Sequence, residues 1–273
     1  MSEARDPRDA VSTTERRRYL DVALALADRS RAVILDHVRR GFGVEVKPDA
    51  SLVTDADVAA ERAVRERAAE LTPEAGVVGE ELADTGVGND LVWVVDPIDG
   101  TAEFASHMPV YGTIIGLFLD GRPLVGVIDH PELDLRVHAG FGLGAWKGDR
   151  RLLLDDLDIA VPDRALRLGL PARIGFTRRS DDGPTFDRVA ARFPNFRTLQ
   201  TCYTHACTAL GALDAAMEWN VRPWDLAATR ILVEEAGGAY LDLGHFDHPG
   251  TGTVCSALFG RPSAVRRVAE AIA

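Results

Sequence analysis

The chain has 273 residues, with 31 lysine and arginine side chains against 42 aspartate and glutamate side chains and a formal net charge of −11. This balance argues against a nucleic-acid groove, because such a groove needs clustered basic residues. No apolar run reaches the ~18 residues that span a bilayer, and the charged N-terminal segment lacks the apolar stretch of a secretory signal. Three cysteines without Cys-x-x-Cys spacing (Cys202, Cys207 and Cys255) predict reduced thiols in a cytoplasmic protein.

The first half of the chain is predicted to contain two helices followed by strands. A capping-box pattern over 12–15 begins an apolar stripe of helical period, which continues to about residue 40. Thr54 or Asp55 caps a second helix that continues to about residue 70. Short apolar runs between turn residues predict strands at 76–79 and 91–95 and an antiparallel meander across 112–153.

In the second half, the predicted strands and helices alternate. Strands are expected at 172–176, 196–200, 213–217, 239–242 and 253–258, and helices at 184–192, 203–211, 224–236 and 262–272. A meander followed by alternating units indicates an α+β or layered α/β fold with two sheets.

The chain shows no repeat, low-complexity tract or linker that would divide it into several domains. Residues 1–11 are interpreted as a flexible tail, and residues 12–273 as one domain. Within that domain, residues 12–160 form the half with the meander, and residues 161–273 form the half with the alternating units.

The most informative segment is 96–101, Asp-Pro-Ile-Asp-Gly-Thr, which directly follows an apolar strand. Carboxylates at the end of a strand project into the crevice where open α/β sheets bind ligands. Asp96 and Asp99 repel each other unless they are protonated or bridged by a cation, and hard oxygen ligands favour Mg²⁺ or Mn²⁺. Gly100 and Thr101 are expected to present backbone N–H groups to a phosphate. Taken alone, the segment also fits an acidic turn that is capped by its own backbone.

Three further acidic segments favour the cation site. Glu80 and Glu81 end another short strand, Asp225 begins a helix, and Asp57 lies in the first turn of the second helix. Each acid alone also fits a helix cap or an exposed charge. Four unrelated caps would not be expected to occur together, so the sequence predicts one site built from all of them.

These segments resemble the signature of the inositol monophosphatase superfamily of Mg²⁺-dependent, lithium-sensitive phosphatases. The shared motifs occur in order along residues 15–272. They are Val-Thr-x-x-Asp at 53–57, Gly-Glu-Glu at 79–81, Asp-Pro-Ile-Asp-Gly-Thr at 96–101, Trp-Asp at 224–225 and Glu-Ala-Gly-Gly at 235–238. The resemblance implies an αβαβα sandwich of the sugar-phosphatase type, a homodimer, and a catalytic role for the whole domain.

The resemblance also implies a set of metal ligands. One Mg²⁺ would be held by Glu80, Asp96 and the backbone carbonyl of Ile98, and a second by Asp96, Asp99 and Asp225. A third, weaker ion often lies near the position of Glu80 in relatives, and Mn²⁺ is an expected substitute. Adjacent ions of this kind clamp phosphate oxygens and acidify a bound water.

The remaining residues are divided between catalysis and substrate binding on the same resemblance. Asp57 and Thr101 would orient and deprotonate the attacking water, and Glu80 would take part through its metal. Lys47 would lie on a mobile loop that covers the metals. Substrate contacts are expected from Asp99, Gly100, Thr101, Thr201 and Glu218.

The expected substrate is a small polyol or amino-alcohol phosphate, such as inositol monophosphate or histidinol phosphate. The segments 47–57 and 222–228 look closest to bacterial histidinol-phosphatase-type members. Two departures weaken that assignment: Ala102 and Glu103 replace the usual Lys followed by Ser or Asn, and Thr201 stands where an Asp is common. Cyclitol phosphates of antibiotic pathways, fructose bisphosphate and adenosine bisphosphate stay open as alternatives.

Two other classes of protein are disfavoured by the same residues. A haloacid-dehalogenase-type phosphatase needs Asp-x-Asp and forms an aspartyl-phosphate, whereas two residues separate Asp96 from Asp99. A catalytically silent regulatory member of the fold would be expected to lack a ligand acid, but all of them are present. We therefore predict a phosphoric monoester hydrolase that binds a small-molecule phosphate ester and neither nucleic acid nor membrane.

Overall fold

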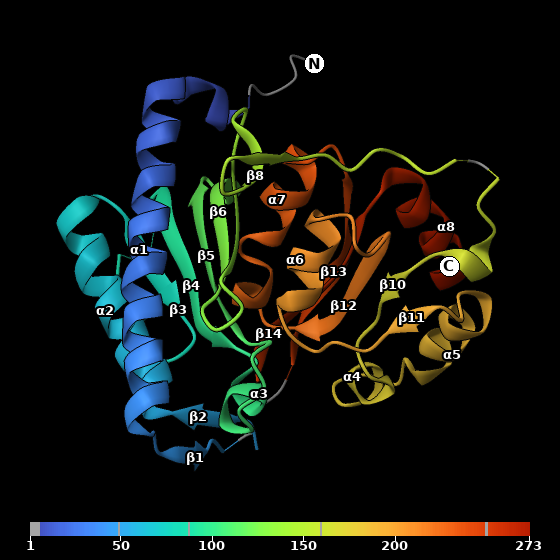
Figure 1. Ribbon diagram of the computed structural model, residues 1–273, viewed down its shortest axis with the longest axis horizontal. Coiled ribbons are helices and arrows are strands. Elements are labelled where there is room, and N and C mark those ends of the chain that lie inside the picture. Colours follow the sequence, from blue (N-terminus) through green and yellow to red (C-terminus); the bar gives the residue numbers. More distant parts are fainter. Residues whose placement is uncertain (1–5, 49, 87, 159, 249–250) are drawn as a thin grey trace.

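The computed structural model describes residues 6–48, 50–86, 88–158, 160–248 and 251–273, and its elements form five layers (Figure 1). Two long helices, α1 (Thr13–Arg40) and α2 (Asp55–Leu71), cover the outer face of a seven-stranded sheet. A five-stranded sheet lies beyond the inner helices α6 (Tyr203–Ala209) and α7 (Thr229–Glu235). Its outer face carries α4 (Arg173–Thr177), α5 (Gly183–Arg192) and α8 (Pro262–Ile272). This is the αβαβα order that the resemblance implies.

Both outer helices begin at the caps that the sequence predicts. Ser12 Oγ accepts a hydrogen bond from Glu15 N, and the Glu15 carboxylate accepts one from Ser12 N, so α1 starts with a capping box. Thr54 and Asp57 repeat this arrangement at α2. The buried face of α1, which includes Leu26, packs on the seven-stranded sheet. None of the described helices is both long enough and apolar enough to cross a membrane.

The seven-stranded sheet brings two acidic segments together. Its strands in spatial order are β3 (Gly76–Gly79), β4 (Leu91–Asp99), β5 (Gly112–Leu119), β6 (Arg122–His130), β7 (Leu135–Gly140), β8 (Gly144–Lys147) and β9 (Arg150–Leu152). The pairs from β4 to β9 are antiparallel, which confirms the predicted meander, whereas β3 and β4 are parallel. In that parallel pair Gly79 lies opposite Val95. The next residues, Glu80 and Asp96, are therefore neighbours at one end of the sheet.

The five-stranded sheet follows a connection over residues 153–167 that includes the 3-10 turn η2 (Asp163–Ala165). Its strands in spatial order are β11 (Phe196–Arg197), β10 (Leu168–Gly169), β12 (Ala215–Val221), β14 (Gly252–Gly260) and β13 (Ala239–His248). The pairing of β12 with β14 shifts register between Glu218 and Val221. This irregularity lies directly before the turn that carries Asp225.

Three predicted elements of the second half differ from the observed ones. Residues 172–176 were expected as a strand, but 173–177 form α4, and the strand β10 comes earlier. A run of five residues is too short for its pattern to distinguish a strand from a helix. The strand expected at 196–200 is only Phe196–Arg197 long. The helix expected at 224–236 is divided into the 3-10 turn η3 (Pro223–Leu226) and α7. Asp225 lies in that 3-10 turn, where its carboxylate accepts a hydrogen bond from Arg222 N at 2.8 Å.

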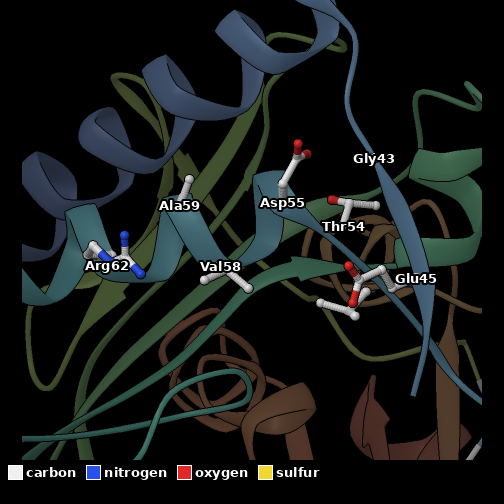
Figure 2. Close-up of a pocket in the computed structure, with 8 residues that line it drawn as sticks. Gly43, Glu45, Thr54, Asp55, Val58, Ala59 and Arg62 are labelled. Carbon is white, nitrogen blue, oxygen red and sulfur yellow. The ribbon is translucent and has the colours of Figure 1, made fainter.

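A two-stranded hairpin of β1 (Val44–Val46) and β2 (Leu52–Thr54) lies beside the start of α2 and contacts the short helix α3 (Thr101–Ala105). Between the hairpin and the first turns of α2 is a pocket of about 440 Å³, shown in Figure 2. It is lined by Gly43, Glu45, Val53, Thr54, Asp55, Val58, Ala59 and Arg62. The predicted metal ligands are not among these residues, so this pocket is distinct from the acidic site.

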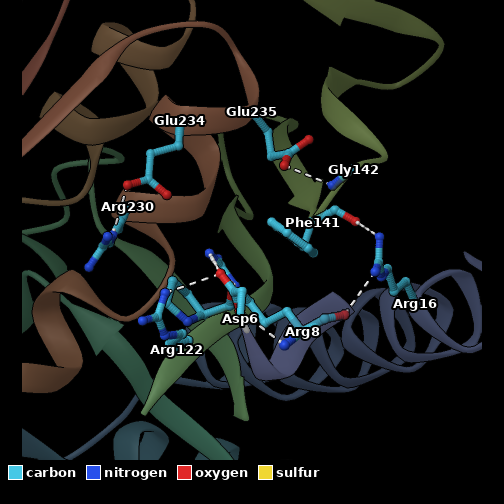
Figure 3. A network of polar contacts seen from close by, with 10 residues as sticks. Asp6, Arg8, Arg16, Arg122, Phe141, Gly142, Arg230, Glu234 and Glu235 are labelled. Carbon is cyan, nitrogen blue, oxygen red and sulfur yellow. Dashed lines mark hydrogen bonds and ion pairs between the residues drawn. The ribbon is translucent and has the colours of Figure 1, made fainter. Parts of the chain in front are cut away.

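The N-terminal segment is packed from residue 6 onward, although the sequence predicts a flexible tail over 1–11; residues 1–5 lie outside the described residues. Arg8, in the 3-10 turn η1 (Pro7–Ala10), is buried and donates a hydrogen bond to Pro123 O at 3.0 Å. Its guanidinium pairs with Asp6 and lies 4.1 Å from the centroid of the Phe141 ring. Arg16 extends this network by donating to backbone oxygens (Figure 3). A charged segment gives no apolar signal of such packing.

Candidate active site

Four of the predicted acids line one cavity of about 410 Å³, although they come from three separate segments. Glu80 follows β3, Asp96 and Asp99 lie near the end of β4, and Asp225 lies in the turn before α7. The cavity therefore lies where β3 and β4 end, and the β1–β2 hairpin, α3 and η3 contribute to its walls. The other lining residues are Ala50, Ser51, Leu52, Ile98, Gly100, Thr101, Ala102, Glu103, Arg178, Gln200, Arg222 and Trp224.

Three of these carboxylates are close enough to bind one cation together. One oxygen atom from each of Glu80, Asp96 and Asp225 lies within 4.8 Å of the other two. Asp99 lines the same cavity but is outside this group of three. One of its oxygens accepts a hydrogen bond from Cys202 N, so the start of α6 fixes its orientation.

The pKa values of the three aspartates in the cavity are raised by burial and by the neighbouring acids. Burial raises the pKa of both Asp96 and Asp225 well above the usual range of an aspartate, and neighbouring carboxylates raise both further. Burial also raises the pKa of Asp99 to about 6, although the nearby His205 ring opposes the rise. Acids in such a cluster stay together only if protons or a cation neutralise them.

The donor set fits a divalent cation. Asp96 Oδ1 is buried and has no hydrogen-bond partner among the residues that the structure describes. A buried carboxylate oxygen without a partner is costly, and a cation would satisfy it. Every predicted ligand atom is a hard oxygen, which is the donor type that Mg²⁺ and Mn²⁺ prefer. Glu80, Asp96 and Asp225 are therefore the residues best placed to hold such an ion.

Beside the cluster, Asp57 and Thr101 form a hydrogen-bonded pair. Thr101 Oγ1 lies 3.2 Å from Asp57 Oδ1 and 3.2 Å from the backbone oxygen of Ile98. The other oxygen of Asp57 accepts hydrogen bonds from the backbone and hydroxyl of Thr54 at the start of α2. Burial raises the pKa of Asp57 against these hydrogen bonds, which makes the carboxylate a better base. Asp57 is thus a helix cap and a candidate base at the same time.

Lys47 reaches the cluster from the turn of the hairpin. Its Nζ lies 2.8 Å from Glu80 Oε1 and 2.8 Å from Glu81 Oε1. Burial lowers the pKa of Lys47, but the two glutamates outweigh burial and hold it above its ordinary value. Burial raises the pKa of Glu81 to about 7, although Lys47 opposes that rise. The ammonium group therefore supplies part of the missing positive charge on the Glu80 side.

Two of the expected substrate residues, Thr201 and Glu218, are not among the residues that line the cavity. The Thr201 hydroxyl donates to Val110 O at 2.8 Å, so it is used within the protein. The Thr201 methyl group packs on Gly100, where a Cβ atom would come within 2.6 Å of it. Gly100 also has a φ of 90°, so only glycine fits this position at the start of α3. Glu218 is buried, with 8% of its surface exposed, and contacts His205.

The structure also shows residues that the sequence patterns did not reveal. Glu61 on α2 is fully buried and accepts hydrogen bonds from Glu81 N at 2.7 Å and Leu82 N at 3.2 Å. Arg65 pairs with Glu61 at 2.8 Å, so together they fix the segment that carries Glu80. The signal was present: an acid one helical turn after Asp57 interrupts the apolar face of the helix. Arg178 and Gln200, which line the cavity, stand outside every predicted motif, and Arg222 begins the segment 222–228 but was given no role.

The fold and the site together define a layered α/β protein with a buried cluster of carboxylates that could hold a cation. The model of the inositol monophosphatase family matches residues 15–271, and the chain belongs to this family. It is accordingly a phosphatase, and the predicted family and αβαβα fold are confirmed.

Individual relatives agree with this assignment. The chain is 37% identical over 233 residues to a histidinol-phosphatase of Mycobacterium tuberculosis, covering 82% of this chain and 87% of that protein. It is 28% identical over 269 residues to an inositol monophosphatase of Dictyostelium discoideum, covering 92% and 94%. Among solved structures, an inositol monophosphatase from Anabaena superposes with a TM-score of 0.77 at 26% identity, covering 94% of this chain and 95% of that one.

Proposed function

We propose that the protein is a Mg²⁺-dependent phosphomonoesterase that hydrolyses a small polyol or amino-alcohol phosphate with an activated water. The observation that carries this proposal is the cluster of Glu80, Asp96 and Asp225, whose oxygens lie within 4.8 Å of one another with raised pKa values for both aspartates. When bound there, divalent cations would neutralise phosphate oxygens and make a water more acidic. Mn²⁺ is expected to substitute for Mg²⁺.

The protein's own residues would prepare the attack. Thr101 Oγ1 can donate its proton to Asp57 Oδ1 and accept a hydrogen bond from the water, which fixes the water's direction. Asp57 would take the proton through this hydroxyl, and its raised pKa suits that role. The backbone oxygen of Ile98, 3.2 Å from Thr101 Oγ1, is a further oxygen atom that could hold a cation. The backbone at the start of α3, where Gly100 has a φ of 90°, would present N–H groups to the phosphate.

Different observations favour histidinol phosphate and inositol monophosphate as the substrate. Similarity to a histidinol-phosphatase at 37% identity favours histidinol phosphate, and Glu103 on the cavity wall is an acid that suits its ammonium group. Thr201 does not supply that acid, and two arginines, Arg178 and Arg222, also line the cavity. Inositol monophosphate therefore stays in the proposed class. The cytoplasmic location and the homodimer stay predictions.

The test is release of phosphate from a panel of histidinol phosphate, inositol 1-phosphate, fructose 1,6-bisphosphate and adenosine 3′,5′-bisphosphate at millimolar Mg²⁺. We expect turnover of at least one of the first two, its loss in EDTA, and inhibition by millimolar Li⁺. Turnover that persists in EDTA would contradict the proposed chemistry. A protein that releases phosphate from none of the four would contradict the proposed function.

A further inference from the structure

Glu218 and His205 form a buried pair, which takes no part in the proposed activation of the water by Asp57 and Thr101. His205 Nε2 lies 3.1 Å from Glu218 Oε1, and the two side chains are 3% and 11% exposed. On the other side of the ring, Nδ1 lies 2.9 Å from Thr229 Oγ1. The Phe259 ring packs edge-on against the imidazole, with 5.1 Å between the ring centroids. Three neighbours therefore fix the orientation of the His205 ring.

The chemistry of the partners assigns the donor at each end of the ring. An ionised carboxylate only accepts hydrogen bonds, so Nε2 carries the proton that is donated to Glu218. In the neutral ring Nδ1 is then an acceptor, and the Thr229 hydroxyl donates to it. This chain of donors occupies one oxygen of Glu218. Within the part of the chain that the structure describes, the Glu218 carboxylate has no second hydrogen bond.

The pair joins the elements that build the site. His205 lies on α6, Glu218 on β12, and Thr229 is the first residue of α7, four positions after Asp225. The charge on Glu218 contributes to the raised pKa values of both Asp99 and Asp225. α6 also fixes Asp99 through Cys202 N, so one helix holds both Asp99 and, through His205, Glu218.

We propose that His205 is a positioning residue that holds the Glu218 carboxylate ready to accept a hydrogen bond from a hydroxyl or ammonium group of the substrate. This rests on the proposed function and on Glu218 as a substrate-binding residue. With Oε1 fixed by the ring, Oε2 is left for the substrate. A glutamate without this partner would have to be ordered during binding, which costs side-chain entropy. His205 thereby favours phosphate esters that carry a donor group over those that carry none.

The test compares two substrates in His205→Ala and His205→Gln. One is whichever of inositol 1-phosphate and histidinol phosphate the unmodified protein hydrolyses faster; the other is phenyl phosphate, which has no donor on its carbon skeleton. In His205→Ala we expect kcat/KM for the first substrate to fall about tenfold, mainly through KM, and that for phenyl phosphate to change less than about twofold. His205→Gln keeps an N–H donor and should recover part of the loss.

Two controls separate positioning from a general structural role. His138→Ala removes an imidazole on β7, outside the cavity lining, and should leave both substrates unchanged. The double variant His205→Ala with Glu218→Gln should lose little more than Glu218→Gln alone, because both substitutions remove one interaction. Equal losses on both substrates, or additive losses in the double variant, would overturn the proposal. Release of phosphate from neither substrate by the unmodified protein would contradict the proposed function itself.

Discussion

Two buried aspartates, Asp96 and Asp129, have opposite surroundings in this molecule. Asp129 on β6 is fully buried and lies 2.7 Å from Arg31 Nη2 and 2.7 Å from Arg136 Nε. Asp96 on β4 is 2% exposed, and the described part of the chain offers it no basic partner. Its charged neighbours are Glu80 and other carboxylates, which raise its pKa further after burial has raised it.

This difference distinguishes a buried acid that only supports the fold from a buried acid that is suited to bind a ligand. A buried carboxylate that only supports the fold needs a counter-charge from the chain itself, since an unpaired buried charge is strongly destabilising. Asp129 has two such counter-charges, and Asp96 has none. The acids around Asp96 therefore need protons or a cation from solution, and this lack of basic partners, rather than the number of acids, distinguishes them from Asp129.

The largest effect is expected from Asp96→Asn, which removes the ligand shared by both expected metal positions. Phosphate release at saturating Mg²⁺ should fall about 10³-fold or more, because the cation site loses its central charge. The free energy of unfolding of the metal-free protein should not fall, because the substitution relieves repulsion between carboxylates. Near-normal turnover by a correctly folded variant would break the comparison.

Asp129→Asn should have the opposite effect, lowering the stability of the protein and leaving its activity unchanged. It leaves Arg31 and Arg136 without their buried partner, so the free energy of unfolding should fall by about 3–5 kcal/mol in urea titrations. The kcat of the folded fraction should stay close to that of the unmodified protein. A variant that keeps its stability and loses its activity would show that Asp129 belongs to the site after all.

The stability of the metal-free protein should decrease as the pH rises. In the folded state the pKa of Asp99 is raised from 3.8 to about 6 and that of Glu81 from 4.5 to about 7, so the folded state retains protons that the unfolded chain has lost. Between about pH 5 and about pH 8 the free energy of unfolding in EDTA should fall by about 1–3 kcal/mol. Asp96→Asn should flatten this dependence. Stability that rises with pH over this range would contradict it.

The smallest effect is expected from Lys47→Met. The Lys47 ammonium lies 2.8 Å from Glu80 and competes there with a cation from solution, so its removal should strengthen Mn²⁺ binding by about threefold to tenfold in calorimetric titrations without substrate. Lys147→Met, at the other lysine of the chain, provides the matched control because that side chain is exposed. Equal affinities in the two variants would show that Lys47 does not compete for the site.

Local sequence patterns indicated which acids lie together in one cavity, because each of these acids ends or begins an element. Glu80 and Asp96 follow apolar strands, and Asp57 lies beside a strong helix cap, so short-range signals place them. Glu61 and His205 were missed because their partners lie 20 and 13 positions away, at Glu81 N and Glu218. Such contacts depend on how helices pack on sheets, which periodicity does not specify.

The fold was predicted with similar limits. Capping boxes and turn residues placed both outer helices and the meander correctly, but the expected strand at 172–176 is the helix α4. A run of five residues, of which all but Arg173 are apolar or small, can form either element. The packing of Phe176 against Trp219, with 4.9 Å between ring centroids, belongs to the helical form. Tertiary contacts of this kind decide short segments.

The central claim is that the chain does not itself neutralise the acidic cluster around Asp96, and that this cluster binds a divalent cation. Isothermal titration of the metal-free protein with Mn²⁺, in two buffers that differ in ionisation enthalpy, tests it directly. We expect saturable binding with release of protons, because acids with raised pKa values must give up protons to bind the cation. Binding should be lost in Asp96→Asn and kept in Asp129→Asn. No saturable binding at millimolar Mn²⁺, or equal binding by both variants, would contradict the account.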